Sequence, residues 1–188
     1  MKILHVTPFF LPYFGGIEYY VYYISRELVK RGHSVSIYTS KTAPNLPEKE
    51  YIDGMLVRRF LPTQYFFGYP LILKLLEELL KSEADLIHCH ISGPIVTELA
   101  ATASKLKGLP LVITIHQCAL PAEDVLTEKK IIANILVAFY NRLFLVYDLT
   151  IAKKIIVVSP STIKLVGPLV KHPDKLVLIP DGVDTELF

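Results

Sequence analysis

Short apolar runs alternate along the chain with longer segments in which apolar residues recur every three or four positions. The runs, bounded by glycine, proline or polar residues, predict buried strands at residues 2–7, 34–40, 55–60, 84–89, 109–115 and 155–159. The segments between them predict helices at residues 17–31, 70–81 and 93–107, and a longer helical region, with a break, at 122–153. This alternation is typical of an α/β fold with a doubly wound, mostly parallel sheet and helices on both faces.

Glycine and proline residues mark the ends of several of these elements. Gly32 and Gly108 follow directly on two predicted helices, and glycine is the usual residue after a helix end. Pro70 suits the first turn of its helix, because proline lacks an amide hydrogen that this turn leaves unpaired. Ser159 and Pro160 fit the N-cap and first position of a further helix after the strand at 155–159.

Composition narrows the possible classes of function. The 188 residues are 52% hydrophobic and 20% charged, which predicts one globular domain over residues 1–188. The net charge of +2 gives no footprint for a nucleic-acid partner, and we expect none. Cys89 and Cys118 lack the spacing of a disulfide framework and favour a reducing, cytoplasmic location. Asn and Gln together number five, and such scarcity is one feature of heat-adapted proteins.

Two stretches bear on export and membranes. The amino terminus enters an apolar strand at once, without the apolar h-region or cleavage site of a signal peptide. The apolar stretch at residues 131–147 contains Asn134, Asn141 and Arg142, which predicts a buried or surface-lying helix rather than a bilayer span. We therefore expect a cytoplasmic protein, and peripheral association with the inner face of the membrane stays open.

The loop after the first predicted strand carries the first candidate site. Its sequence PFFLPYFGGIEYY places Gly15 and Gly16 directly before a helix. Two glycines let a ligand approach the backbone, and the free amides of a helix start can bind an anion such as a diphosphate. A tight strand-to-helix turn explains the same pair equally well. The three-glycine fingerprint of dinucleotide sites is missing, and Thr39 and Ser40 stand where an acidic residue would bind the ribose, which disfavours an oxidoreductase.

Histidines lie at the carboxyl ends of two other predicted strands. Alternation along the strand ending in DLIHCH places His88 and His90 on one side and Cys89 on the other. His116 directly follows the next strand. Because two histidines without a third ligand are usually hydrogen-bonded, we expect polar lining of a pocket rather than a zinc site. His5, within the first strand, is interpreted as structural.

These candidates share a position at the carboxyl ends of predicted strands. In an open parallel sheet, ligands bind outside these ends, near the point where the strand order reverses. We therefore expect the glycine pair to line one crevice together with His88, His90 and His116.

Two aromatic clusters have less distinct roles. Tyr19, Tyr20, Tyr22 and Tyr23 spread around much of a predicted helix, and the segment YFFGY at residues 65–69 precedes the next helix. Either cluster could contact a sugar, and residues 65–69 could also face a membrane. Packing in the core is the interpretation we favour for most of these rings.

Six motifs, in order through almost the whole chain, resemble the retaining GT4-type glycosyltransferases. They are PYFGGIEYY, ELVKRGHSVSIYT, ADLIHCH, LVITIHQ, IIVVSPS and VLIPDGVDTELF. The resemblance implies the Rossmann-like, acceptor-side amino-terminal domain of a two-domain GT-B fold. It implies that Gly15 and Gly16 approach the donor diphosphate and that His116 contacts the donor sugar near the reacting centre. The residues that would line the cleft or the acceptor side are Glu18, His88, His90, Ser159 and Asp181, of which Asp181 stands where the family usually has asparagine.

The resemblance also implies an activity for the whole protein. This is transfer of a hexose from a UDP-, GDP- or ADP-sugar to a glycan, lipid or small-molecule acceptor, with retained configuration and without a required metal or other cofactor. The family's carboxy-terminal domain supplies a basic pair for the leaving diphosphate, and we expect this donor-binding domain to be absent from residues 1–188. Alone, the chain should then be inactive or very weak. The alternative is a non-catalytic sugar-nucleotide-binding module, or one subunit of a split transferase.

Overall fold

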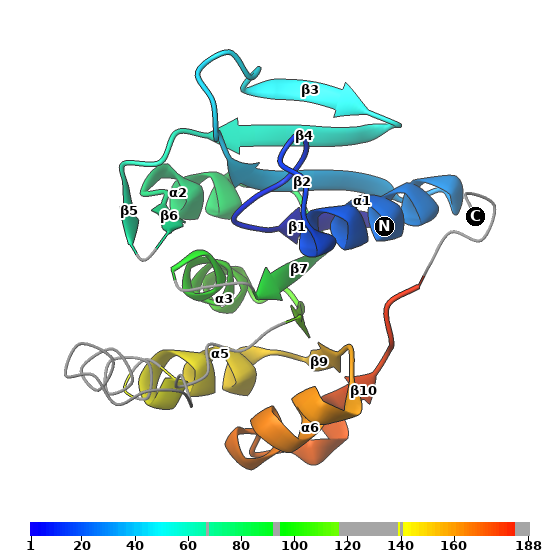
Figure 1. Cartoon of the computed structure of the whole chain (residues 1–188), viewed down its shortest axis with the longest axis vertical. Helices are drawn as coiled ribbons and strands as arrows, with labels where there is room; N and C mark the ends of the chain where they lie inside the picture. The colour runs from blue at the N-terminus through cyan, green and yellow to red at the C-terminus, as the bar shows by residue number, and fades with distance from the viewer. Residues whose placement is uncertain (67, 92–94, 117–138, 140, 183–188) are drawn as a thin grey trace.

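An eight-stranded sheet runs through the middle of the domain, in the order β10-β9-β8-β7-β1-β2-β4-β3 (Figure 1). The computed structural model describes residues 1–66, 68–91, 95–116, 139 and 141–182. All neighbouring strands of this sheet are parallel except β3 and β4, and β5 and β6 form a separate antiparallel hairpin. The strands are β1 (Lys2–Val6), β2 (Ser34–Ser40), β3 (Lys49–Ile52), β4 (Met55–Phe60), β5 (Gln64–Phe66), β6 (Tyr69–Leu71), β7 (Leu86–Ile91), β8 (Leu111–Ile115), β9 (Lys154–Val157) and β10 (Leu176–Leu178).

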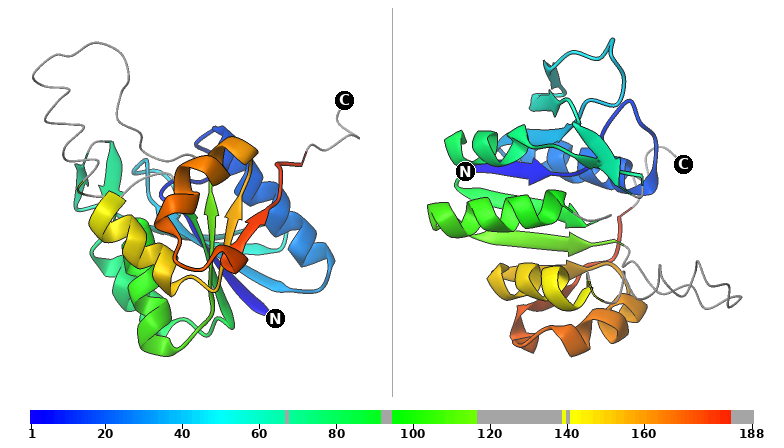
Figure 2. Two further views of the ribbon diagram at one scale, coloured as in Figure 1. Left: turned by 90° about the horizontal axis from the view of Figure 1, so that it is seen from below. Right: turned by 90° about the vertical axis from the view of Figure 1, so that its left-hand side faces the viewer.

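Helices cover both faces of the sheet, which confirms the doubly wound fold predicted from the sequence (Figure 2). Helix α1 lies on one face, and α2, α3 and α5 pack side by side on the other. A π-helical turn, η1, leads into α5, and two 3-10 turns, η2 and η3, separate α6 from β10. The bounds are α1 (Gly16–Lys30), α2 (Lys74–Lys81), α3 (Val96–Lys107), η1 (Asn141–Leu145), α5 (Val146–Ile151), α6 (Pro160–Val166), η2 (Gly167–Leu169) and η3 (Pro173–Lys175).

The strand register decides which side chains share a face. Leu4 of β1 pairs with Ile87 of β7, and both belong to the larger core, which also holds side chains of α2, α3 and α5. On the opposite face, Val35 and Ile37 of β2 pack with Val21 of α1 in a smaller core. Each fully buried aliphatic side chain of this kind contributes about 2 kcal/mol. Alternation along the strands thus buries both faces of the sheet.

Strand β1 lies where the strand order reverses. From β1 the chain passes to β2 and β4 on one side, and it later continues from β7 to β8, β9 and β10 on the other. The connections that leave the carboxyl ends of β1 and β7 therefore turn to opposite faces of the sheet. In open α/β sheets, ligands bind at this switch point.

Several predicted ends of elements are confirmed. Gly108 ends α3 in the left-handed conformation with a φ of 66°, and Gly32, with a φ of 81°, follows α1. Ser159 caps α6 by accepting a hydrogen bond from the backbone N–H of Thr162, and Pro160 is the first residue of that helix.

Other predicted elements differ from the structure. Pro70 does not begin a helix; it is buried in β6 opposite Tyr65, and α2 begins at Lys74. A proline is tolerated there because the hairpin has only edge strands. Strand β3 was missed, since it lies partly in a polar, proline-bearing stretch and pairs only with β4. The helical region predicted at 122–153 falls mostly outside the described residues, and η1 and α5 are its described part.

Candidate functional site

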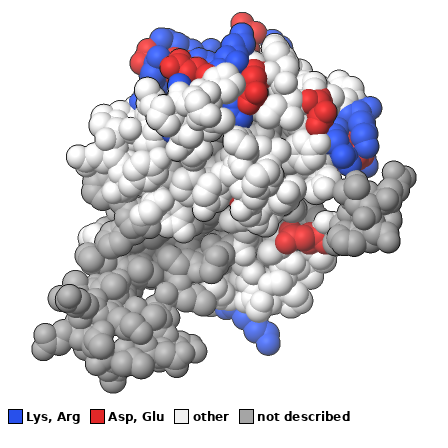
Figure 3. All heavy atoms as spheres, turned by 45° about the horizontal axis from the view of Figure 1, so that its top comes forward, with Lys and Arg blue, Asp and Glu red and all other residues white. Residues whose placement is uncertain are grey.

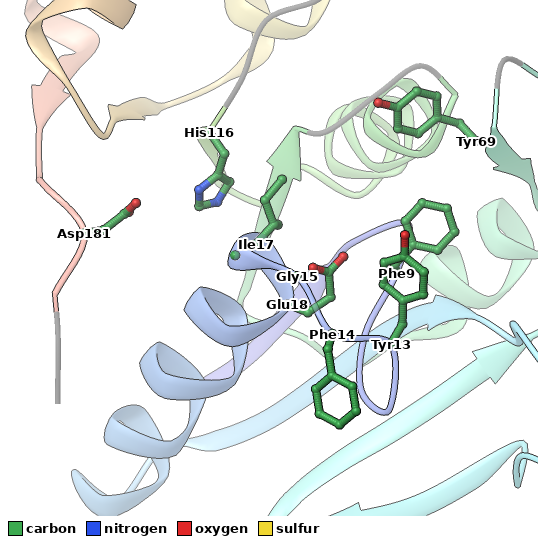
Figure 4. Close-up of a pocket in the computed structure, with 10 residues that line it drawn as sticks. Phe9, Tyr13, Phe14, Gly15, Ile17, Glu18, Tyr69, His116 and Asp181 are labelled. Atoms are coloured by element: carbon green, nitrogen blue, oxygen red, sulfur yellow. The ribbon is translucent and has the colours of Figure 1, made fainter. Parts of the chain in front are cut away.

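A pocket of about 500 Å³ opens at the carboxyl ends of β1 and β8 (Figure 4). Four separate stretches line it: the loop after β1 with the start of α1, the first residue of β6, the residue after β8, and the segment after β10. The lining residues are Phe9, Tyr13, Phe14, Gly15, Gly16, Ile17, Glu18, Tyr69, His116 and Asp181. Five candidates from the sequence, which come from three distant stretches of the chain, therefore meet here.

Hydrogen bonds to neighbouring strands hold the loop between β1 and α1, which forms one wall of the pocket. Ser40, at the end of β2, donates to the carbonyl oxygen of Pro8 from its backbone nitrogen at 3.2 Å and from its Oγ at 2.5 Å. Arg59 of β4 donates to the carbonyl oxygen of Leu11 at 2.7 Å and forms a salt bridge with Glu50 of β3. The Arg59 side chain is almost fully buried, which would be costly for an unpaired charge. The carboxylate of Glu50 and the carbonyl oxygen of Leu11 compensate this charge. Two strands thereby position the loop.

The start of α1 presents a glycine backbone and a carboxylate together. Gly15 is the N-cap of α1, and Gly16 is its first residue. A Cβ added to Gly16 would meet no atom within 4 Å, whereas one added to Gly15 would collide with Oε2 of Glu18. Glu18 thus folds back against Gly15 at the positive end of the helix, and burial raises the pKa of its carboxyl. The approach to the helix start is open at Gly16 and filled by Glu18 at Gly15.

His116 and Asp181 reach the pocket from separate strands. His116 directly follows β8, and burial lowers the pKa of its imidazole to about 4, so the ring is neutral near pH 7. Asp181 follows β10, and desolvation raises the pKa of its carboxyl. No lysine or arginine is among the described residues that line the pocket. The pocket therefore offers an imidazole, carboxylates and aromatic rings to a ligand, and its own lining supplies no cation.

His88 and His90 do not line the pocket, contrary to the expectation from the sequence. They are buried beneath it with His5, and we call these three residues the buried histidine cluster. The strand register explains the assembly, because His5 lies opposite His88 and Thr114 lies opposite His90, all on the face that α1 covers. His5 is therefore more than an isolated structural histidine. Its partners come from a strand more than 80 positions away, which the spacing of residues along the sequence does not show.

Hydrogen bonds link the cluster to the pocket. Nδ1 of His5 lies 2.9 Å from Nε2 of His90, and Nδ1 of His90 lies 3.3 Å from Nε2 of His116. His88 bonds instead to Oγ1 of Thr114, at 2.7 Å from its Nε2. Burial lowers the pKa of His5 to about 3, and burial together with the neighbouring imidazoles holds those of His88 and His90 well below the usual range. The cluster is therefore neutral near pH 7.

Among the described residues, the buried histidine cluster is the group that could hold a metal ion. One nitrogen from each ring lies within 4.8 Å of the others, so the statement that His88 and His90 lack a third partner was wrong. Neutral imidazoles are suitable zinc ligands. However, the hydrogen bonds to His5, to Thr114 and to His116 already use several of these nitrogens, and a metal ion would have to replace them. Cys89 points into the larger core on the other face, as predicted, and is not a ligand here.

Aromatic side chains form the remaining rim. Phe9 stacks on Tyr13 with ring centroids 5.0 Å apart, and its ring lies 6.5 Å from that of Tyr69. Core packing is wrong for Tyr65, which is 53% exposed, while Tyr69 is half-buried and lines the pocket. The signal that could have identified Tyr69 is the neighbouring Pro70. We had predicted that Pro70 begins a helix, whereas both residues belong to the hairpin strand β6.

The tyrosines of α1 divide between core and surface. Tyr20 and Tyr22 pack against the smaller core, whereas Tyr19 is 42% exposed, so core packing holds for only part of this cluster. The ring of Tyr20 meets that of His116 edge-on, with centroids 4.6 Å apart. Tyr20 therefore supports the pocket histidine from the side of the helix.

Ser159 is not among the residues that line this pocket. Its Oγ accepts the backbone N–H of Thr162 at 3.2 Å and lies 2.7 Å from Oγ of Ser161. The hydroxyl thus serves as a helix cap, and the cleft role that the resemblance implied has no support in the described residues.

The surface shows how charge is distributed around the domain. On the face in Figure 3, acidic and basic side chains are mixed at the top and upper right, and the described middle of the face is largely uncharged. Among the described residues, no helix combines the length and the apolar character needed to cross a lipid bilayer.

Fold and site together define a class of protein, an open α/β domain with a ligand pocket at the switch point of its sheet. A model of Glycosyltransferase Family 4 matches residues 14–187 of the chain. This chain therefore belongs to Glycosyltransferase Family 4, as the six motifs indicated.

Curated relatives agree with this assignment. The phosphatidylinositol N-acetylglucosaminyltransferase GPI3 subunit of Saccharomyces cerevisiae is 27% identical, with coverage of 100% of this chain and 40% of the relative. The D-inositol 3-phosphate glycosyltransferase of Acidothermus cellulolyticus is 28% identical, with coverage of 100% and 44%. The chain thus spans less than half the length of either relative.

Solved structures show the same fold at lower identity. Sucrose-phosphate synthase from Thermosynechococcus elongatus superposes with a TM-score of 0.65 at 20% identity, over 100% of this chain and 50% of that one. Anabaena Alr3699/HepE in complex with UDP-glucose superposes with a TM-score of 0.60 at 17% identity, over 100% of this chain and 45% of that one. The chain has the fold of the amino-terminal domain of a GT-B glycosyltransferase.

Proposed function

We propose that this chain is the acceptor-side domain of a retaining glycosyltransferase that moves a hexose from a nucleotide-sugar to a glycan, lipid or small-molecule acceptor. The observation that carries the proposal is the convergence of Gly16, His116 and Asp181 on one pocket at the switch point of the sheet. Imidazole and carboxylate groups can hydrogen-bond sugar hydroxyls, and the rings of Phe9 and Tyr13 can stack on the apolar face of a sugar.

A second domain, outside residues 1–188, would complete the catalytic site. Charge develops on the leaving diphosphate, and preorganised positive groups stabilise it. The described lining of this pocket contains Glu18 and Asp181 but no cation, so it suits hydroxyl groups better than phosphates. The relatives named above are more than twice as long as the segment they share with this chain, which leaves room for such a domain in the whole protein.

The donor and the acceptor are proposed by class. One structural neighbour holds UDP-glucose, which supports a nucleotide-sugar donor. The names of two relatives contain an inositol compound, phosphatidylinositol in one and D-inositol 3-phosphate in the other. A polyol ring, free or lipid-linked, therefore fits the acceptor side.

We also propose that the protein lies at the cytoplasmic face of a membrane. Tyr13, Phe14 and Tyr65 expose half or more of their surface, and the first two also line the pocket. Aromatic residues of this kind favour the membrane interface. The protein should co-sediment with phosphatidylinositol-containing vesicles, and the substitution Phe14→Ser should lower the fraction of protein that sediments with them. Equal co-sedimentation of the wild type and the Phe14→Ser variant would argue against this location.

The substrate class is tested by calorimetric titration of the chain with UDP-glucose and GDP-mannose. We expect weak binding, because residues 1–188 would supply only one wall of the proposed cleft. Gly16→Ala adds a methyl group to the open approach and should weaken binding about tenfold, or about 1.4 kcal/mol. Gly167→Ala is the matched control, since a Cβ there also meets no atom within 4 Å but lies in η2 outside the pocket.

Three outcomes would contradict parts of the proposal. If Gly16→Ala and Gly167→Ala bind the sugars equally well, the ligand does not approach the start of α1. If the 188-residue chain transfers sugar efficiently, no second domain is needed. Saturable binding without transfer, even when the whole protein is assayed, would favour the non-catalytic binding module.

A further inference from the structure

Three imidazoles form a hydrogen-bonded row that ends in the pocket. His5 lies in β1, His90 in the adjacent strand β7, and His116 directly after β8, which pairs with β7. The row runs from Nδ1 of His5 to Nε2 of His90, and from Nδ1 of His90 to Nε2 of His116. His90, in the middle, uses its two nitrogens toward its two neighbours, so the bonds are connected end to end.

The number of protons constrains the direction of these bonds. A neutral imidazole carries one N–H donor and one acceptor nitrogen. His5 and His90 are fully buried, and the lowered pKa values keep all three rings neutral. If one ring donates through Nδ1, its Nε2 must accept, so the direction of the first bond decides that of the second. Two arrangements exist, with all protons on Nδ1 or all on Nε2.

The buried end of the row selects between them. Nε2 of His5 is buried and has no hydrogen-bond partner in the described part of the chain. An unpaired buried N–H is rarer in proteins than an unpaired acceptor. His5 therefore carries its proton on Nδ1, where the N–H donates to Nε2 of His90. His90 is then protonated on Nδ1 and donates to Nε2 of His116.

We propose that His5 and His90 act as positioning residues that fix His116 in its Nδ1–H tautomer, with this N–H directed at the ligand pocket. Nε2 of His116 is occupied by His90, so Nδ1 is the nitrogen left for a ligand. In this tautomer His116 donates a hydrogen bond to an oxygen of the ligand and offers it no lone pair. It is then a hydrogen-bond donor rather than a general base.

The tautomer of His116 does not depend on the proposed glycosyl transfer; only its use on a sugar or phosphate oxygen rests on that function. The structure of the row can therefore be tested without substrate. Long-range ¹H–¹⁵N correlation spectra of the labelled chain at pH 7 distinguish Nδ1–H from Nε2–H for each histidine. We expect the Nδ1–H pattern for His5, His90 and His116. An Nε2–H pattern for His116 would overturn the proposal.

Substitution at the far end tests the transmission along the row. His5→Asn keeps an amide donor near the place of Nδ1, and His116 should stay in the Nδ1–H form. His5→Phe removes the donor, and His116 should shift at least in part to Nε2–H. His172→Gln, at an exposed site outside the row, should change neither pattern.

The variants also separate positioning from folding. Amide spectra and thermal unfolding would report whether each variant keeps the native fold. A folded His5→Phe variant with unchanged Nδ1–H at His116 would contradict the transmission. If His5→Phe does not fold, the wild-type spectrum and His5→Asn still decide, because loss of the Nδ1–H pattern in His5→Asn would equally contradict it.

Discussion

The buried histidine cluster and the loop between β1 and α1 meet at one edge of the sheet but are held in different ways. His5, His88 and His90 are part of the strands, so the backbone ladder sets their positions. The loop residues are held by a few bonds from outside, such as those from Ser40 and Arg59. The cluster is almost fully buried, whereas the loop exposes aromatic rings to the pocket.

This difference separates stability from ligand contact. Removing a buried imidazole leaves a cavity and an unpaired partner, so its cost falls on folding. A side chain at the rim has solvent on one side, and its removal costs mainly the contact with ligand. His116 stands at the boundary, because it bonds to His90 on one side and faces the pocket on the other.

The largest expected effect is on activity at this boundary. In the whole enzyme, His116→Ala should lower kcat/KM about 10²–10³-fold, the usual loss on removal of one preorganised donor. Its free energy of unfolding should fall by only about 1 kcal/mol, since the ring is partly exposed. His172→Ala serves as the control and should change neither quantity. Parallel losses of activity and stability would instead indicate that His116 is a structural histidine.

Within the buried histidine cluster, we expect a substitution to lower the stability of the fold strongly. His90→Ala removes a fully buried ring between His5 and His116 and should lower the free energy of unfolding by about 3 kcal/mol. Urea denaturation followed by circular dichroism measures this change. A loss below about 1 kcal/mol would show that the cluster supports the fold no more than the loop does.

Acid should lower the contribution of the cluster to the free energy of unfolding by slightly less than His90→Ala does. The pKa of His5 is about 3 in the fold and near 6.5 when unfolded, so the unfolded chain binds the extra proton between these values. The contribution of His5 is complete above pH 6.5 and declines as the pH falls toward 3. At pH 5 the loss is about 2 kcal/mol. Burial raises the pKa of Asp148 to about 9, which acts in the opposite direction.

A comparison of variants removes this opposing contribution. The difference in free energy of unfolding between the wild type and His5→Asn should change by about 2 kcal/mol from pH 7 to pH 5, with the variant favoured at the lower pH. Denaturant titrations at both pH values measure it. A difference that is independent of pH would mean that the pKa of His5 is the same in the folded and the unfolded chain.

The contrast between the two regions also explains what the sequence could predict. Apolar periodicity predicted six strands of the sheet, and the motifs identified the family together with Gly16, His116 and Asp181 in the pocket. The burial of His88 and His90 was missed, because it depends on the pairing of β1 with β7 and on the cover that α1 provides. Such contacts join residues distant along the chain and leave no local pattern.

The smallest expected effect concerns Ser159, which lies at the same edge of the sheet but outside both regions. Ser159→Ala removes the acceptor of the Thr162 N–H and should lower the free energy of unfolding by about 1 kcal/mol, as for other N-caps. Binding of nucleotide-sugars should be unchanged, because the hydroxyl does not line the pocket. Ser161→Ala, at an exposed position in the first turn of the same helix, removes only the contact of its hydroxyl with Oγ of Ser159 and leaves the cap acceptor in place, so it should change stability by less than about 0.5 kcal/mol. Weaker binding by Ser159→Ala at unchanged stability would restore Ser159 to the ligand cleft.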